Sequence, residues 1–494
     1  MIIESNKKIV NRQIIENYLP SFSLNGRKRI VLIETPSSIR PIARNIFYRP
    51  NASKYRIGHD IVPNITSPPY DVALLATYLL SMEYDAVVLD ANAIPFSLEE
   101  ITSWILKTRP DFVIIHASDN TFLEDLALTA FIEGIGIPCI YWDEILAPYR
   151  IPFIRDNFRF VKRILGEEPE LNITKLLQSE NNHGLICLNG GSGIDLNSLP
   201  TINFNLLPMG RYTKWGKRFW QTFLMRGCAW GKCTYCLQAR ESRQKNYRVR
   251  NIEHLGKELN LAINNYGVEH VSFLSYEINP SLHYFEQLIA LMSSYKAVTW
   301  EGFIRADHFN PQMISKARKS GCVELYIGVE NVNSSIIKGT KKDIVLNNVK
   351  KLFHLCNRAG IRATAMVVIG TPEETEDTIK ETIKFLKTVN PWAVVPAYLR
   401  VFPGTPIEKI INKDKIEYDY LQELIETKGR ETGVEPGFIN NNIPREKLQH
   451  LYFQLKGIGK NKLQWYLAYI NGFFRQKRLI EEVLVRLLKL TGKV

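Results

Sequence analysis

The sequence predicts an α/β protein with two successive series of alternating strands and helices, followed by a helical C-terminal region. Short apolar runs rich in β-branched residues alternate with amphipathic helical patterns twice along the 494 residues. A turn-rich stretch separates the two series, and the composition, 45% hydrophobic and 23% charged, is typical of a globular protein. We expect two to four domains in a chain of this length, each with its own core.

The first series, residues 29–183, predicts a doubly wound parallel sheet, because strands that alternate with helices pair in parallel. Buried strands are expected at 29–34, 85–90, 111–116 and 137–142. Helices are expected at 71–82, from Ser97 onward and near 121–133. Glu100 follows Ser97 by three residues and completes a capping box. Residues 1–28 form a polar extension before this domain, and ligands of such sheets bind outside the carboxyl ends of the strands.

Residues 184–215 are expected to form a linker, because the run 189–200 is rich in Gly, Asn, Ser and Asp and cannot continue a helix. A second series of strands follows, at 219–225, 270–275, 299–304, 323–328, 363–370 and 394–400. Helical patterns lie between these strands, at 252–265, 280–294, 312–319, 346–359 and 373–388. Six strand–helix units predict a partial or full βα-barrel over residues 216–412, with its chemistry at the carboxyl ends of the strands.

Residues 413–494 are predicted to form a helical domain that is rich in lysine and aromatic residues. Its last segment, 472–489, has the pattern of a basic amphipathic helix. Such a helix either docks on the barrel or makes peripheral contact with a membrane surface, and both interpretations stay open.

Three of the seven cysteines lie within nine residues, directly after the first strand of the second series. Cys228, Cys233 and Cys236 have the spacing Cys-x4-Cys-x2-Cys. Three thiolates on one loop can hold three corners of a 4Fe–4S cubane and leave the fourth iron open. A structural zinc site would need a fourth ligand, and the nearest downstream histidine, His254, lies outside ordinary finger spacing. A disulfide scaffold suits short secreted chains.

The net charge and the cysteine content bear on the partners and the compartment that we expect for this protein. The net charge of +13, from 63 Lys+Arg against 50 Asp+Glu, favours acidic partners, but the basic residues are spread along the chain. We expect a cytoplasmic protein, because the first residues lack the apolar core of a signal peptide and no apolar run is long enough to span a bilayer. The remaining cysteines are scattered in mostly apolar settings and are expected to be buried thiols: Cys139, Cys187, Cys322 and Cys356.

With these motifs in order, the chain resembles the radical S-adenosylmethionine (SAM) superfamily, and within it the subgroup that carries a cobalamin-binding domain. In the barrel the resemblance is carried by the cysteine loop with Tyr235 before its last cysteine and by the stretches 301–305, 326–331, 368–375 and 402–406. Upstream it is carried by 68–79, Asp90, 109–111 and 166–170. The resemblance covers roughly residues 29–406, and the order of the motifs is more specific than any one of them.

Two features depart from the family pattern. The usual spacing is Cys-x3-Cys-x2-Cys, so the first gap here has one extra residue. No Asp-x-His-x2-Gly motif is present to supply a lower cobalt ligand, and 141–144 replaces the glycine-rich turn expected after the fourth strand. The resemblance therefore implies cobalamin bound without a histidine ligand. His116, at the end of a strand, either faces a corrin ring or is a structural histidine.

The resemblance also assigns candidate SAM contacts at the ends of the barrel strands. Tyr235 would meet the adenine, Glu277 the amino group of SAM and Arg305 its carboxylate. Glu330 would accept hydrogen bonds from the ribose, and Gly370 would let the backbone approach the adenine. Each has a structural alternative: the two glutamates as solvated carboxylates, the arginine as one half of an ion pair, and the glycine as part of a helix start. No catalytic side chain and no cobalamin contact are assigned.

The implied function is reductive cleavage of SAM to a 5′-deoxyadenosyl radical that functionalises an unactivated C–H carbon, with cobalamin-dependent C-methylation as the reaction. The implied cofactors are a 4Fe–4S cluster, SAM and cobalamin. The expected partners are a small-molecule, lipid or peptide substrate and an external electron donor of the ferredoxin or flavodoxin type.

Three alternatives stay open. The first is cobalamin-free radical C–C coupling or cyclisation, for instance of a lipid chain. The second is tRNA modification of the methylthiotransferase type, although such enzymes carry three N-terminal cysteines and only Cys139 and Cys187 precede the loop here. We therefore do not expect a nucleic-acid partner. The third is a passive iron–sulfur or zinc binding module.

Overall fold

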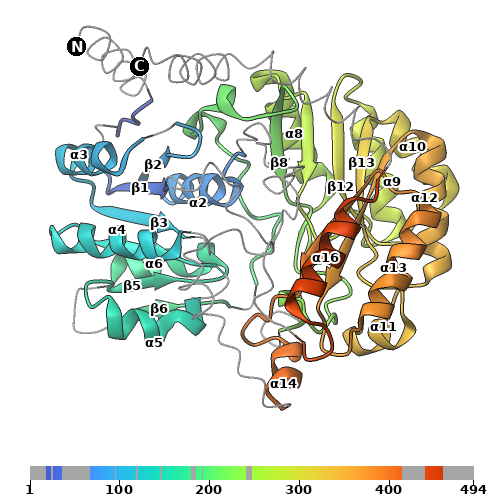
Figure 1. The fold of residues 1–494 in the computed structure, drawn as a ribbon. Coiled ribbons are helices and arrows are strands. Elements are labelled where there is room, and N and C mark those ends of the chain that lie inside the picture. Colours follow the sequence, from blue (N-terminus) through green and yellow to red (C-terminus); the bar gives the residue numbers. More distant parts are fainter. Residues whose placement is uncertain are drawn as a thin grey trace, which may run out of the picture.

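The computed structural model places two mostly parallel sheets side by side, each packed against helices (Figure 1). It describes residues 18–23, 26–35, 67–94, 96–117, 121–144, 147–179, 185–191, 193–240, 247–413 and 440–459. The predicted α/β class is confirmed. The predicted helix at 472–489 and most of the predicted domain 413–494 lie outside the described residues. None of the described helices is both long and apolar enough to cross a membrane.

The N-terminal sheet has six strands in the order β2-β1-β3-β4-β5-β6, and neighbouring strands are parallel throughout. The strands are β1 (Arg29–Glu34), β2 (Asp85–Asp90), β3 (Phe112–His116), β4 (Cys139–Trp142), β5 (Arg163–Leu165) and β6 (Ile186–Leu188). The first four are the predicted strands. The last two escaped prediction because three residues are too few to set a periodicity, and β6 lies inside the segment predicted as a linker. The strand order reverses between β1 and β3, where such sheets bind their ligands.

Both faces of this sheet are covered by helices, so its strands are apolar on both sides. The helices are α2 (Tyr70–Ser81), α3 (Leu98–Thr108), α4 (Phe122–Gly134), α5 (Ala147–Asn157) and α6 (Pro169–Gln178). Within β1, Ile30 and Leu32 belong to the core that includes α2 and α6, whereas Val31 and Ile33 belong to the core that includes α3. The predicted capping box of Ser97 and Glu100 is present at the start of α3.

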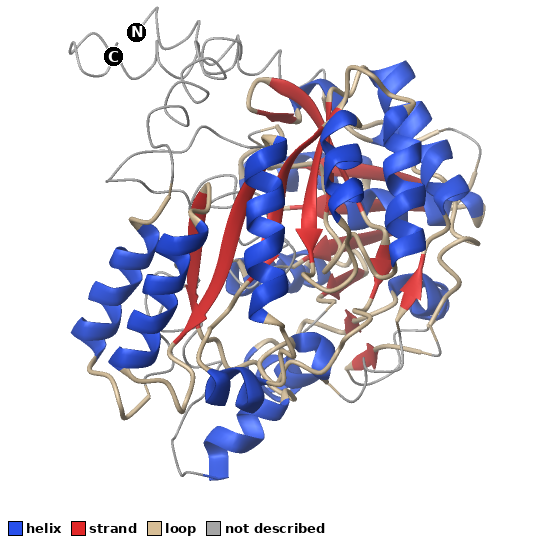
Figure 2. Ribbon diagram, turned by 90° about the vertical axis from the view of Figure 1, so that its right-hand side faces the viewer, coloured by secondary structure: helices blue, strands red, loops and turns tan. Residues whose placement is uncertain are grey.

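The second sheet has seven strands in the order β15-β14-β13-β12-β11-β8-β7. They are β7 (Thr213–Lys214), β8 (Lys217–Thr222), β11 (His270–Phe273), β12 (Thr299–Ile304), β13 (Cys322–Gly328), β14 (Arg362–Ile369) and β15 (Ala393–Tyr398). All pairs are parallel except β7 with β8. Because β7 and β15 are opposite edges of the described sheet, the barrel is partial, as Figures 1 and 2 show.

The barrel helices form a layer on the outer side of this sheet (Figure 2). They are α8 (Ile252–Tyr266), α9 (Leu282–Ser293), α10 (Pro311–Lys319), α11 (Ser334–Thr340), α12 (Leu346–Ala359) and α13 (Glu376–Val389). Two further helices follow, α14 (Pro406–Lys413) and α16 (Arg445–Lys456). Helix α16 covers the edge strand β15, where the rings of Tyr398 and Tyr452 stack with centroids 4.7 Å apart. An edge strand is thereby protected from pairing with another chain.

The first barrel strand is shorter than predicted. Strand β8 ends at Thr222, and the chain then forms a separate short strand, β9 (Met225–Arg226). Strand β9 pairs antiparallel with β10 (Arg248–Val249), so this two-stranded ribbon brackets the loop that carries the three cysteines.

Candidate functional site

A cavity of about 330 Å³ lies at the carboxyl ends of the barrel strands. Its walls come from the cysteine loop, from the ends of β12 and β13, from β14 and from the segment between α11 and α12. The apolar part of its lining includes Phe303, Ile304, Tyr326, Ile344, Met366 and Val368. The site therefore lies at the end of the barrel that the sequence predicts, and its walls are suited to excluding water.

The side chains of Cys228, Cys233 and Cys236 all line this cavity, and all three are free thiols. The loop between them is tight, because the Cys236 N–H donates to the Cys233 carbonyl at 2.9 Å. Backbone hydrogen bonds join Thr234 to neighbouring elements at both ends: its N–H donates to Thr340 at the end of α11, and its carbonyl accepts from Ile407 at the start of α14. The loop is thus fixed by hydrogen bonds that do not depend on any cofactor.

The three thiols lie together, partly buried, on one wall of the cavity. Burial raises the pKa of Cys228 to about 11 and that of Cys236 to about 12, so without a cation beside them these thiols stay protonated. Among the residues that the structure describes, no three His, Cys, Asp or Glu side chains gather closely enough to hold one metal ion. A cubane bonds each cysteine through a different iron, so its ligands need not converge on a point.

The extra residue in the first cysteine gap is accommodated on the outer side of the loop. Trp230 is not among the residues that line the cavity; its indole N–H donates to the Lys341 carbonyl at 2.8 Å. Gly231 follows with φ +57°, a left-handed conformation that a glycine adopts without strain. The insertion therefore leaves the ligating side chains on the cavity wall and forms an outward bulge.

Glu277 lies behind the cysteine loop. It is buried, and its Oε1 accepts a hydrogen bond from the Ala229 N–H at 2.8 Å, with the Cys228 sulfur at 3.6 Å. Its Oε2 lies 3.6 Å from the Arg305 Nε, whereas the Arg305 guanidinium reaches Asp307 at 2.6 Å. Arg305 lines the cavity and Glu277 does not. This geometry gives Glu277 a positioning contact with the loop, and its predicted contact with the amino group of SAM stays a prediction.

Glu330 and Lys342 face each other on the cavity wall. The Lys342 Nζ lies 2.9 Å from the Glu330 Oε1, and the nearby carboxylate and the Cys233 sulfur keep the pKa of this partly buried lysine above its usual value despite desolvation. Glu330 has φ +58°, a strained conformation for a side chain with a Cβ and one that recurs at functional sites. Sequence reasoning missed Lys342. The sequence feature that could have indicated Lys342 is the charged run Lys341-Lys342-Asp343, in a loop on the ligand-binding side of the barrel.

Of the two residues predicted to lie near the adenine, Tyr235 lines the cavity and Gly370 does not. The buried hydroxyl of Tyr235 lies beside the Cys233 side chain. Gly370 has φ +87° but is not among the cavity residues, and a Cβ there would lie 3.3 Å from Leu448 of α16. Its N–H donates to the buried carboxylate of Glu374. Gly370 therefore allows the turn after β14 and the close packing of α16 against this turn.

The carboxyl edge of the N-terminal sheet carries a buried polar cluster. At the point where the strand order reverses, the His116 Nδ1 lies 2.7 Å from the Glu34 Oε2. Burial alone would lower the pKa of His116, but the Glu34 carboxylate raises it to about 9. Next to them, Asp90 accepts a hydrogen bond from the Tyr212 hydroxyl at 2.8 Å. His116 is thus a partnered residue whose ring centroid lies 4.4 Å from that of Trp142.

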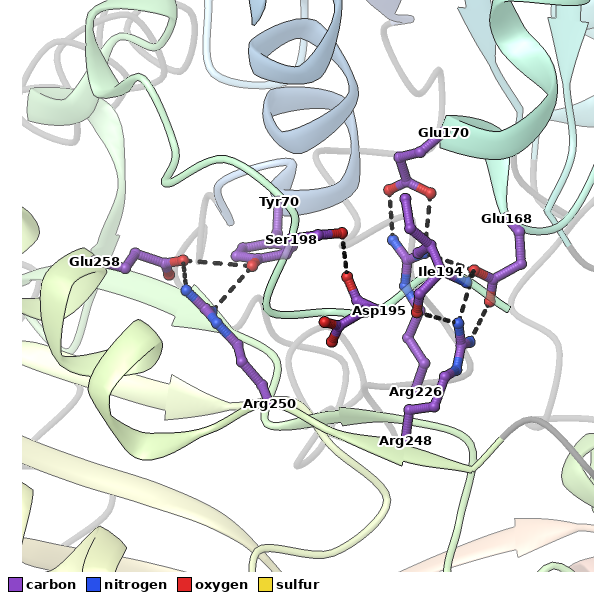
Figure 3. Close-up of polar contacts among 10 residues, drawn as sticks. All are labelled: Tyr70, Glu168, Glu170, Ile194, Asp195, Ser198, Arg226, Arg248, Arg250 and Glu258. Atoms are coloured by element: carbon purple, nitrogen blue, oxygen red, sulfur yellow. Dashed lines mark hydrogen bonds and ion pairs between the residues drawn. The ribbon is translucent and has the colours of Figure 1, made fainter. Parts of the chain in front are cut away.

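Arginine–carboxylate pairs join the two sheets beside the cysteine loop (Figure 3). Arg226 makes a bidentate contact with Glu170, at 2.6 and 2.9 Å, and a contact of 3.1 Å with Glu168. Arg248 adds a second contact to Glu168, at 2.5 Å. Farther along the interface Arg250 pairs with Glu258 within the barrel part and donates to the hydroxyl of Tyr70 in α2 at 3.2 Å. A small cavity of about 60 Å³ lies among these groups and is lined by Arg226, Arg248 and Glu168 together with other residues of both parts.

Comparisons with known proteins agree with this geometry. The model of the radical SAM superfamily matches residues 222–386, which contain the cysteine loop and most of the cavity wall. Residues 222–386 are a radical SAM domain. This domain provides three thiols, free and on one wall of a cavity at the carboxyl ends of the strands, and three thiols on one loop are the donor set that a 4Fe–4S cluster with one open iron requires.

Similar proteins extend the likeness beyond the barrel. The chain is 23% identical over 443 residues to the uncharacterized methyltransferase PH0819 of Pyrococcus horikoshii, covering 85% of this chain and 91% of the relative. It is 22% identical over 441 residues to the anaerobic magnesium-protoporphyrin IX monomethyl ester cyclase of Cereibacter sphaeroides, covering 81% and 70%.

Two solved structures share the two-sheet architecture. The radical SAM methyltransferase TsrM from Kitasatospora setae, with tryptophan and a SAM analogue bound, matches with a TM-score of 0.59 at 14% identity, covering 78% of this chain and 76% of that one. The cobalamin-dependent SAM radical enzyme OxsB, with aqua-cobalamin and SAM bound, matches with a TM-score of 0.62 at 14% identity. That match covers 80% of this chain and 62% of OxsB. At these identities the likeness shows a common fold.

Proposed function

We propose that this radical SAM enzyme cleaves SAM reductively to a 5′-deoxyadenosyl radical and methylates an unactivated C–H carbon, with cobalamin as its second cofactor. The observation that carries the proposal is the placement of Cys228, Cys233 and Cys236 on one wall of the 330 Å³ cavity. The names of PH0819, TsrM and OxsB support methylation and cobalamin as the reaction and cofactor.

The side chains around the cavity have distinct tasks. A cluster held by the three cysteines supplies, when bound, the electron that breaks a C–S bond of SAM. Arg305 and the Glu330–Lys342 pair offer a cation, an acceptor and a donor to the polar groups of SAM, so we assign them to SAM binding together with Tyr235. The apolar walls exclude water, which would otherwise compete for these hydrogen bonds.

Cobalamin is assigned to the carboxyl edge of the N-terminal sheet, on the side that faces the cysteine loop. Two buried polar atoms at this edge have no hydrogen-bond partner among the described residues: the Ser67 hydroxyl, which precedes α2, and the Trp142 indole N–H, at the end of β4. An uncompensated buried polar group is costly, and the amide groups at the rim of a corrin are both donors and acceptors. His116 is paired with Glu34, which supports a binding mode without a histidine ligand. Bound cobalamin supplies a carrier for the transferred methyl group.

The test is anaerobic reconstitution with iron, sulfide, reductant and SAM, followed by measurement of 5′-deoxyadenosine. We expect its formation by the wild-type protein and its loss in Cys228→Ala, together with loss of cluster absorbance. An intact cluster without 5′-deoxyadenosine would contradict reductive cleavage. Comparative profiling of small molecules, lipids and modified peptides in a deletion strain and its parent then identifies the substrate.

A second candidate is cobalamin-free radical C–C coupling or cyclisation in the same cavity. It is favoured by the interface beside the cysteine loop, where Arg226 and Arg248 bridge to Glu168 and the cavity between the two parts measures only about 60 Å³. One of the relatives, from Cereibacter sphaeroides, is named as a cyclase. Absorbance of the protein after loading with hydroxocobalamin and desalting decides between the two, because a bound corrin is coloured.

A further inference from the structure

The outer surface of the cysteine loop carries an aromatic ring, Trp230, that contacts two cations. The Lys232 Nζ lies 4.8 Å from the centroid of the Trp230 ring, and the Arg305 guanidinium carbon lies 5.3 Å from it. The ring is half-buried, and Ala229 and Lys232 on either side of it are exposed. Trp230 thus extends from the surface, beside Lys232, to Arg305 on the cavity wall, and it lies in the chain between two cluster ligands.

This surface differs in charge from the inner side of the loop. On the inner side, Arg305 is paired with Asp307 and Lys342 with Glu330. On the outer side, Lys232 and Lys341 are exposed, and in the described part of the chain neither has a carboxylate within ion-pair distance. Two exposed lysines therefore flank the partly exposed indole in contacts: Lys232 through its ammonium group and Lys341 through its backbone carbonyl.

The remaining sides of the loop are covered. The sulfur atoms face the cavity, Arg226 binds the carboxylates of the N-terminal part, and the Thr234 backbone is hydrogen-bonded on both sides. Within the described part of the chain, the stretch from Ala229 to Lys232 is therefore the side of the loop that is open to a large partner.

We propose that Trp230, Lys232 and Lys341 form the docking patch for an acidic protein that carries one electron. The proposal rests on the proposed reductive cleavage of SAM. One electron leaves the carrier, which is oxidised, and the same electron is consumed when the C–S bond of SAM breaks to give methionine and the 5′-deoxyadenosyl radical. A net positive patch attracts an acidic partner, and weak interfaces of this kind are typical of electron-transfer encounters.

The test compares two reductants on the same reconstituted enzyme. Reduced flavodoxin is the protein probe and dithionite is the small-molecule control, with 5′-deoxyadenosine as the readout. In Lys232→Glu/Lys341→Glu we expect the flavodoxin-driven rate to fall about tenfold at low salt, because charge reversal removes electrostatic steering. The dithionite-driven rate should stay within twofold of wild type. In Lys232→Arg/Lys341→Arg, which keeps the charges, the flavodoxin-driven rate should be retained.

A matched control reverses two exposed lysines at the opposite end of the barrel. Lys296 precedes β12 and Lys319 precedes β13, so Lys296→Glu/Lys319→Glu changes the net charge equally without touching the patch. If this control slows the flavodoxin reaction as much as the patch variant, the patch proposal is overturned, as it is if the patch variant is unimpaired. Equal loss with both reductants would assign the lysines to the structure of the loop. Absence of product with dithionite in the wild type would refute the proposed function itself.

Discussion

The Glu277 carboxylate accepts a hydrogen bond from the Ala229 N–H at 2.8 Å and thereby holds the first residue after Cys228. The carboxylate is almost fully buried, and Arg305 lies near its other oxygen, at 3.6 Å. The contact joins the end of the second barrel strand to the cysteine loop. It sets the position of the loop before any cluster is bound, so the loop does not have to be ordered by its cofactor.

Replacing Glu277 tests whether it positions the loop or binds SAM. In Glu277→Ala the partly buried hydrogen bond from the Ala229 N–H to a charged carboxylate is lost, which costs on the order of 1–3 kcal/mol. We expect the iron content after reconstitution to fall by half or more, whereas Glu277→Gln, which keeps an acceptor, retains most of it. Iron and sulfide analysis measures the effect. Normal iron content with weakened SAM binding would instead support the contact with the amino group of SAM.

For the Glu330–Lys342 pair we expect a change in SAM binding and no change in iron content. Lys342→Met removes the cation that faces Glu330 and changes the polar wall of the cavity, but it leaves the hydrogen bonds of the cysteine loop intact. We expect the dissociation constant of SAM to rise about tenfold, equivalent to about 1.4 kcal/mol, with unchanged iron content. Equilibrium dialysis with SAM measures it. Lys338→Met, at an exposed lysine of α11, is the matched control, and a loss of iron in Lys342→Met would contradict the assignment.

Most of the fold follows from local patterns, whereas the details of the site depend on tertiary contacts. Strand β12 and helix α12 have the predicted bounds, because an apolar run and an amphipathic pattern end there at clear turn signals. Strands β5 and β6 and the seven-residue helix α11 are too short to give such a signal.

Among the site residues, the three cysteines were predictable from spacing alone, since their ligand role needs only one loop. The roles of Glu277 and Lys342 were not, because each depends on a partner distant in sequence or on backbone conformation. Glu277 lies 48 residues from Ala229, and the Lys342 contact depends on the left-handed backbone of Glu330. A strand end fixes where a side chain begins but does not determine whether it points into the cavity or toward the loop behind it.

The bidentate contact between Arg226 and Glu170 is expected to hold the two parts of the chain together. Glu170 is buried, and removing one partner of a buried pair leaves the other charge uncompensated, a loss of about 3 kcal/mol. We expect Glu170→Gln to lower the thermal unfolding midpoint by several degrees. The double variant Arg226→Met/Glu170→Gln should lose less than the sum of the two single changes. Additive losses in calorimetry would contradict a direct coupling. Lys380→Met, which breaks the exposed pair of Lys380 with Glu376, is the control and should leave the unfolding midpoint nearly unchanged.

The pair of His116 and Glu34 predicts a pH dependence of stability. The folded-state pKa of His116 is raised from 6.5 to about 9, so the folded protein holds this proton more tightly than the unfolded chain does. The contribution of His116 to the free energy of unfolding is therefore complete below pH 6.5 and is lost as the pH rises toward 9. Its upper limit is about 3 kcal/mol. In urea unfolding of the N-terminal sheet, the wild-type midpoint should fall between pH 6.5 and 9. His116→Gln should remove that slope, and His354→Gln, at an exposed histidine of α12, should keep it. A wild-type midpoint that stays level across this range would refute the stabilising role of the charged pair.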